Sequence, residues 1–236
     1  MSPIELAQSV VDYGGLQYLV QCIQEPDMSI KRVSMCVLAD IAKHSTDLAQ
    51  RVIESSAVKH ALQLVSTTDI LLNRQICCLL AQVAKRTKDS AGQTINAMSS
   101  LPDLMTVRDS YVLNNTVTYS GAVAKHGEIF CKKLVEANGL FDFVTNCIRD
   151  SRLRSQYAAC VTVGKIAACG EVYGMRVRDT GSVAALMQLM SDSTCPVHIV
   201  REATRSIGII GSQSASLASE MGQKSFKKLY ELISIT

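Results

Sequence analysis

Residues Ile41 to Glu54 read IAKHSTDLAQRVIE, and this stretch returns three more times in diverged form. The later copies are VAKRTKDSAGQTIN, VAKHGEIFCKKLVE and, most faintly, IAACGEVYGMRVRD. The alanines in the second place of the copies are Ala42, Ala84, Ala124 and Ala167, so the copies are separated by 42, 40 and 43 residues. Such a period, with apolar residues every three or four positions, predicts stacked helical units, because one unit alone cannot bury its apolar face.

A period near 42 residues is typical of armadillo and HEAT repeats, and the first unit favours the three-helix armadillo form. Gly14 and Gly15 separate the first two apolar patterns, with Ser56, Asn138 and Gly181 at the matching turns, and Pro26 ends the second pattern so that Asp27 can cap the third helix. The expected apolar faces contain Leu6, Val10 and Val11, then Leu16, Leu19, Val20 and Ile23, then Ile30, Val33, Val37 and Ile41. The predicted fold class is all-α, a right-handed superhelical armadillo-repeat solenoid.

The same divisions give a single armadillo-repeat domain over residues 1–236, with units at about 2–43, 45–85, 87–125, 127–168 and 170–210 and a partial unit at 212–236. The third unit is the weakest match. Ser90 and Gly92 lower the helix propensity of its first helix, and Asn114, Asn115 and Gly121 lower that of its long helix. We expect an irregular third repeat.

The composition is that of a folded globular protein, with 236 residues, 47% of them hydrophobic and 19% charged. Apolar runs such as Ile76 to Ala84 are shorter than the roughly 18 residues of a membrane span, and the first residues lack the pattern of a signal peptide. The net charge of +3 is not gathered into a basic tail. We therefore expect a cytoplasmic protein with neither a nucleic-acid nor a membrane partner.

The nine cysteines are expected to be reduced and structural, forming neither a disulfide framework nor a metal site. Their number is odd, no C-x-x-C pair occurs, and five of them fall inside helical apolar patterns, where a thiol packs as a small hydrophobe. These five are Cys22, Cys36, Cys77, Cys147 and Cys160.

Signatures of catalysis are missing from the sequence. It contains no G-x-x-x-x-G-K loop, no H-E-x-x-H helix and no nucleophile with a local base, so we expect no enzyme, no catalytic residues and no cofactor. His44 and His126 share one place after an Ala-Lys pair, and we expect a structural role at the end of a helix rather than a repeated ligand or proton switch.

Two stretches within the first two units resemble a known family. The stretch CIQEPDMSIKRVSMCVLADIAKHSTDLAQ, Cys22 to Gln50, closely resembles a repeat of the sperm-associated antigen six family of armadillo proteins, and ELAQSVVDYGG, Glu5 to Gly15, resembles the opening helix of its repeats. The resemblance is specific over about residues 1–65 and extends only to repeat period and order afterwards. It implies a non-enzymatic scaffold on the central-apparatus microtubules of motile cilia and flagella, with tubulin or central-apparatus components as partners and the axonemal cytoskeleton as location. The family's proteins have further repeats upstream, so the chain is expected to be a fragment, a short paralogue or a truncated gene product.

In armadillo proteins the third helices line a concave groove, and one row of positions in this sequence is expected to face it. The candidates in that row are Arg32, Arg74, Asn114, Tyr157, Lys165, Arg201 and Arg205. Guanidinium groups bind carboxylates through two parallel hydrogen bonds, and the same row offers a single acid, Asp40, so the groove suits an acidic segment such as a tubulin tail. The alternative is that these charged residues form a solvated helix face that binds no partner.

A function unrelated to cilia is also compatible with the row. A cytosolic armadillo adaptor or cargo receptor would use the same positions to bind extended acidic peptides. A nuclear-import receptor is disfavoured, because the chain has no tryptophan and the row has no asparagine at the position where such receptors hold a peptide backbone.

The two ends of the repeat array are expected to be bare. The opening helix has the apolar pattern of an interior unit, and the chain ends inside a unit. The last apolar positions are Phe226, Leu229, Tyr230 and Ile233, spaced i, i+3, i+4 and i+7. We expect these four residues to form an interface for end-to-end self-association or for another protein.

Overall fold

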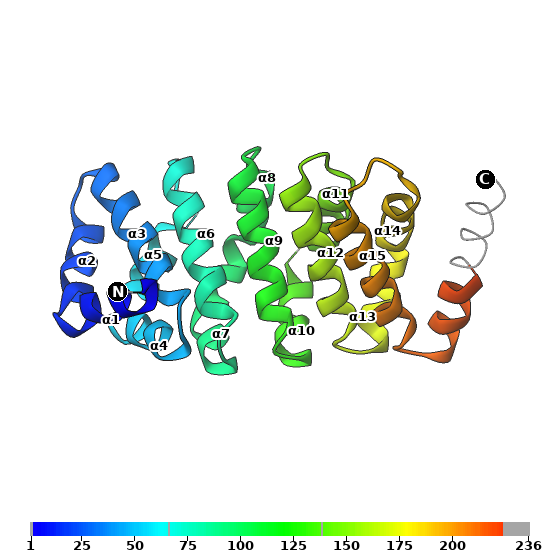
Figure 1. Cartoon of the computed structure of the whole chain (residues 1–236), viewed down its shortest axis with the longest axis horizontal. Helices are drawn as coiled ribbons and strands as arrows, with labels where there is room; N and C mark the ends of the chain where they lie inside the picture. Colours follow the sequence, from blue (N-terminus) through cyan, green and yellow to red (C-terminus); the bar gives the residue numbers. More distant parts are fainter. Residues whose placement is uncertain (1, 66, 138, 224–236) are drawn as a thin grey trace. The chain divides into compact units, whose positions relative to one another are not determined.

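The computed structural model describes residues 2–65, 67–137 and 139–223. Every regular element in these ranges is helical (Figure 1). The all-α part of the prediction is confirmed.

The helices follow one another in triplets. The first triplet is α1 (Pro3–Asp12), α2 (Gly15–Gln24) and α3 (Met28–Ala42), and the second is α4 (Thr46–Glu54), α5 (Ala57–Leu64) and α6 (Ile70–Ala84). The third contains α7 (Lys88–Thr94), a 3-10 helix η1 (Ile95–Ser100), α8 (Leu101–Thr106) and α9 (Ser110–Ala124). Then come α10 (Glu128–Glu136), α11 (Leu140–Arg149) and α12 (Leu153–Ala167), followed by α13 (Glu171–Asp179), α14 (Ser182–Ser191) and α15 (Val197–Gly211).

Two compact units divide the chain, Met1–His126 and Gly127–Thr236. The first holds three triplets and the second holds two, followed by a helical segment over residues 215–223. In the first unit the long third helices α3, α6 and α9 pack in series (Figure 1), and in the second unit α12 packs on α15. Each of these five helices is 15 residues long, so their positions can be compared one by one.

The core consists of apolar rows that recur from one third helix to the next. The eleventh position, for example, supplies the buried side chains of Leu38, Leu80 and Val163. Burial of a side chain of this size stabilises a fold by roughly 1.5–3 kcal/mol, so the summed rows hold each unit together.

The turns form where the sequence indicates them. Asp27 caps α3 by accepting hydrogen bonds from the backbone N–H groups of Ser29 and Ile30, at 2.7 and 3.1 Å. A left-handed residue joins the first and second helices in four of the triplets. These residues are Gly14, Ser56, Gly139 and Gly181, with φ of 78°, 69°, 81° and 79°. Asn138, the expected turn residue in the fourth triplet, lies outside the described residues.

The expected irregularity of the third triplet is confirmed in its first two helices. There α7 has 7 residues and α8 has 6, with the 3-10 segment between them. The long helix α9 is nevertheless complete, despite Asn114, Asn115 and Gly121. Asn115 donates from Nδ2 to the carbonyl oxygen of Arg74 at 3.0 Å, so a contact with α6 offsets the low intrinsic propensity of this segment.

The predicted apolar faces of the first triplet are wrong in part. Leu6, Ile30 and Val33 are 59%, 41% and 63% exposed. Leu48 and Leu72, which occupy the places of Leu6 and Ile30 in the second triplet, are fully buried. The sequence pattern marks positions that a preceding triplet covers, and within the described residues α1 and α3 have no preceding triplet.

None of the helices in the described ranges is long and apolar enough to cross a membrane.

Candidate protein-binding surface

The fifth residue of each third helix belongs to the predicted binding row, and in the first unit two of these residues are already paired. Arg74 on α6 contacts Asp109, the N-cap of α9, through Nε to Oδ1 at 2.9 Å and Nη2 to Oδ2 at 2.5 Å. Arg32 on α3 makes the same two-point contact with Asp69, the N-cap of α6, with Nε 3.1 Å from Oδ1. Asp40 is the one acid at the positions of the row, but Asp69 and Asp109 reach the row from the next triplet and pair with its arginines.

The partners of Asp69 and Asp109 favour the ionised form of each carboxylate. The guanidinium of Arg74 holds the pKa of Asp109 below its usual value, and hydrogen bonds from the backbone of Val112 and Tyr111 act in the same direction. The guanidinium of Arg32 likewise lowers the pKa of Asp69. Arg74 also lies over the ring of Tyr111, 4.9 Å from its centroid. Both arginines thus link one triplet to the next, and their two-point hydrogen bonding to a carboxylate is already used inside the protein.

On α9 the predicted row has an uncharged residue, Asn114, in place of an arginine. Asn114 is half-buried, and its Nδ2 donates to Oδ1 of Asn115 at 3.1 Å. Its backbone oxygen accepts from the hydroxyl of Thr118 at 2.7 Å. An amide in this place offers a partner hydrogen bonds and no charge.

The second unit presents its part of the row to solvent. Arg201 is exposed on α15, and Arg205, one turn later, has a side chain that is 72% exposed and lies 3.9 Å from Glu202. Tyr157 on α12 is partly exposed, and its ring lies 5.9 Å from that of the exposed His198 on α15. The α12–α15 face, defined here by Tyr157, His198, Arg201 and Arg205, therefore combines two cations with an aromatic pair.

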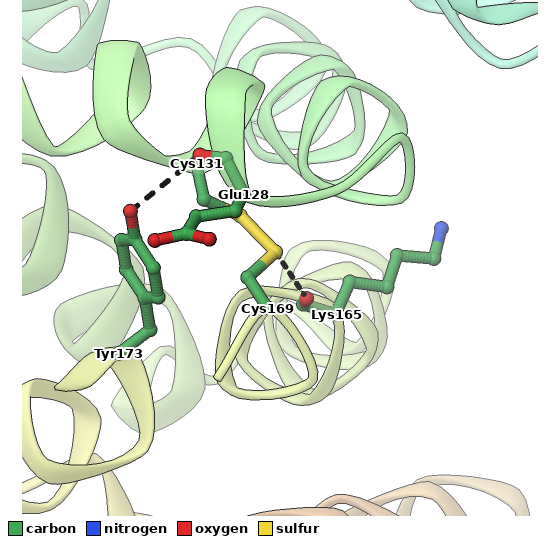
Figure 2. The surroundings of a disulfide bond; sticks show 5 residues. All are labelled: Glu128, Cys131, Lys165, Cys169 and Tyr173. Carbon is green, nitrogen blue, oxygen red and sulfur yellow. Dashed lines mark hydrogen bonds between the residues drawn. A yellow bond between two sulfur atoms is a disulfide. The ribbon is translucent and has the colours of Figure 1, made fainter. Parts of the chain in front are cut away.

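The remaining candidate, Lys165, is half-buried near the C-terminal end of α12. Its backbone oxygen lies 3.4 Å from Sγ of Cys169, which forms a disulfide with Cys131. Figure 2 shows the side chain of Lys165 extending away from this disulfide. The structure thus brings Tyr157 together with His198 on α15. Arg32 and Arg74 have a different role, because each forms an ion pair that links one triplet to the next. Whether any of these residues binds a partner remains a prediction.

Sequence reasoning missed a second basic feature, at the ends of the third helices in the first unit. The C-caps of α3, α6 and α9 are Lys43, Lys85 and Lys125, which we name the C-cap lysine row. Lys43 pairs with Asp40 at 2.7 Å, and Lys125 donates from Nζ to the carbonyl oxygen of Lys85 at 2.7 Å. The Ala-Lys pair shared by three copies of the repeat was the available signal.

The residues after Lys85 and Lys125 also contact the ends of third helices. Arg86 donates from Nε to the carbonyl oxygen of Ala42 at 3.1 Å, and Nε2 of His126 lies 2.7 Å from the carbonyl oxygen of Ala84. Each of these side chains contacts the C-terminal carbonyl of the preceding third helix, where unpaired carbonyls need donors. The structural role expected for His126 is confirmed by this contact.

The expectation that all cysteines are reduced is wrong for one pair. Cys131 on α10 and Cys169, just after α12, form a disulfide with their Cα atoms 6.6 Å apart (Figure 2). Beside it, the hydroxyl of Tyr173 donates to the carbonyl oxygen of Glu128 at 3.5 Å. The pair was missed because its members are 38 residues apart in a helical repeat, and only the packing of α10 against the turn after α12 places them together.

The other seven cysteines are free thiols. Burial raises the pKa of Cys77, Cys147 and Cys160 to about 12, so these thiols stay protonated and pack as small apolar groups. Within the ranges described above, no group of three or more His, Cys, Asp or Glu side chains is placed to hold a metal ion.

The predicted end interface of Phe226, Leu229, Tyr230 and Ile233 lies outside the described residues.

Comparisons with known proteins establish the fold and nothing finer. No protein-family model matches the chain, and no curated protein matches it. Among solved structures, a designed armadillo repeat protein is 19% identical with a TM-score of 0.82, covering 89% of this chain and 87% of that one. An engineered protein is 22% identical with a TM-score of 0.84, covering 92% and 90%.

A third similar structure is a designed armadillo repeat protein in complex with the peptide (KR)4, 19% identical with a TM-score of 0.80, covering 87% of this chain and 86% of that one. At these identities the likeness shows the fold alone. The predicted armadillo-repeat solenoid is confirmed, whereas the resemblance to the sperm-associated antigen six family gains no support from the comparisons.

Proposed function

We propose that this protein is a non-enzymatic scaffold of the axonemal central apparatus that binds an acidic protein segment on the exposed face of its third helices. The armadillo repeat fold is typically a binding scaffold, and function in such a fold depends on what the surface presents. The observation that carries the proposal is the α12–α15 face, where Arg201 and Arg205 are exposed beside the Tyr157–His198 ring pair.

The positive charge of Arg201 and Arg205 on this face favours an acidic partner. Guanidinium groups pair with carboxylates in a two-point geometry, and exposed cations steer anionic partners over a range set by salt. The similar designed armadillo protein holds the basic peptide (KR)4. A basic face on the same fold suits a peptide of the opposite sign, and the acidic tails of tubulin have that chemistry.

The axonemal setting rests on the resemblance of residues Glu5 to Gly15 and Cys22 to Gln50 to the sperm-associated antigen six family. A cytosolic adaptor for acidic peptides is the second candidate, because the basic face supports it equally and needs no cilium. Location separates the two. The full-length tagged protein, expressed in a ciliated cell, should lie along the axoneme, and an even cytoplasmic signal with unlabelled axonemes would contradict the axonemal proposal while leaving the adaptor.

A further inference from the structure

The C-cap lysine row contains one cation whose side chain has no hydrogen-bond or ion-pair partner among the residues that the structure describes. Lys43 pairs with Asp40, and Lys125 donates to a backbone carbonyl, as Arg86 does. The ammonium of Lys85 makes no hydrogen bond or ion pair with any residue that the structure describes. Attraction to helix C-terminal carbonyls therefore explains Lys125 and Arg86, and the Asp40 carboxylate explains Lys43, whereas neither explains Lys85.

The surroundings of Lys85 disfavour its charge. Burial lowers its pKa most, and the positive charges of Arg86, Lys125 and Lys43 lower the pKa further. Arg86 adds a second uncompensated group, because its Nη2 is buried without a hydrogen-bond partner among the described residues. Four cations thus meet at one edge of the first unit, with Asp40 as the carboxylate paired there. An anion placed beside Lys85 would remove both the repulsion and the missing pairing.

We propose that the C-cap lysine row is a binding site for the carboxylates of an extended acidic protein segment, with Lys85 at its centre. The row crosses the ends of three helices that pack in series, α3, α6 and α9. Neighbouring helix axes lie about 8–10 Å apart, and an extended chain advances about 3.3 Å per residue, so a segment of roughly seven residues passes all three lysines. The site rests on the proposed function, to which it adds a second set of residues apart from the α12–α15 face.

The test is a fluorescence-anisotropy titration of the full chain with a labelled ten-residue glutamate peptide, and with a glutamine peptide as a neutral probe. The site variant replaces Lys43, Lys85 and Lys125 by Gln. The matched control replaces the exposed Lys59, Lys132 and Lys133 by Gln, which removes the same charge elsewhere. Because a charged hydrogen bond contributes about 1.5–3 kcal/mol, Lys85→Gln alone should weaken binding at least roughly tenfold, and the site variant more.

Protection of Lys85 gives a measurement that needs no variant. Acetic anhydride modifies exposed amines, and mass spectrometry of the wild type should show slower acetylation of Lys85 when the glutamate peptide is present, with Lys132 unchanged. Equal weakening by the site variant and the control, or undiminished acetylation of Lys85, would overturn the site.

The failure of the site and the failure of the proposed function have different signatures. If binding is lost in a variant with Arg201→Gln and Arg205→Gln and kept in the site variant, the lysine site is wrong and the α12–α15 face stands. If the wild type does not bind the glutamate peptide, the lysine site and the acidic-segment part of the proposed function are both overturned, and axonemal location still decides the scaffold role.

Discussion

Arg74 and Asp109 form a two-point ion pair in which the acceptor is also the N-cap of the next long helix. Asp109 Oδ1 accepts from Nε of Arg74 at 2.9 Å and from the backbone N–H groups of Tyr111 and Val112 at 3.1 and 3.0 Å. One carboxylate thus begins α9 and attaches it to α6. Arg32 and Asp69 repeat the arrangement between α3 and α6, so the device belongs to the repeat and not to a single site.

Two substitutions at Asp109 separate its two roles. Asp109→Ala removes both the cap and the ion pair, and loss of an N-cap alone lowers the free energy of unfolding by about 1 kcal/mol. Asp109→Asn keeps a side chain that caps well and loses the charge. We expect Asn to be less destabilising than Ala in urea denaturation followed by circular dichroism. Equal effects would mean that the cap adds nothing beyond the ion pair.

Acid should weaken the first unit through the same aspartates. The folded-state pKa values of Asp69 and Asp109 are below the ordinary aspartate value, so their ionised forms stabilise the fold. This contribution is present above about pH 4, the ordinary pKa of aspartate, and is lost as pH falls through the lowered folded-state values. In thermal melts from pH 7 downward, a variant with Asp69→Asn and Asp109→Asn should lose less stability with acid than the wild type. Parallel curves would contradict the role given to the two pairs.

Reduction of the Cys131–Cys169 disulfide should lower the stability of the second unit. The bond closes a loop across 38 residues of sequence separation, and loops of such length correspond to about 2–4 kcal/mol of stabilisation in proteins. Melting with and without dithiothreitol should differ in the wild type, and a variant with Cys131→Ser and Cys169→Ser should melt at one temperature in both conditions. Nine free thiols in the oxidised, denatured wild type would show that the bond does not form.

Charge-reversal variants should distinguish the arginines of the row that bind a peptide from the one that stabilises the fold. Arg201→Glu with Arg205→Glu should weaken binding of a glutamate peptide, because both side chains are exposed on the α12–α15 face. Arg74→Glu should mainly destabilise the fold, since it would place a second carboxylate against Asp109. Anisotropy titrations and melts of both proteins check this division. Strong loss of peptide binding by Arg74→Glu with an unchanged melt would place Arg74 back in the binding surface.

The repeat pattern was sufficient to predict the fold, because periodic apolar residues and turn residues act locally. Asp27 caps α3 as expected, and Gly14 and Gly181 adopt the left-handed geometry that their turns need. The partners of surface groups were not predictable in the same way. Asp69 and Asp109 read from sequence as N-caps, and their approach to Arg32 and Arg74 depends on how successive triplets stack. The pairing of Cys131 with Cys169 likewise depends on tertiary packing, because 38 residues separate the two in sequence.

Binding to microtubules is the most direct measure of the central claim, that this scaffold binds an acidic protein segment. The full chain should sediment with microtubules at low salt, and it should be released as the Debye length falls below roughly 10 Å near 0.1 M salt. Microtubules whose acidic carboxyl-terminal tails have been removed by limited proteolysis should retain much less of it. Equal sedimentation with intact and trimmed microtubules, or none with either, would contradict the account.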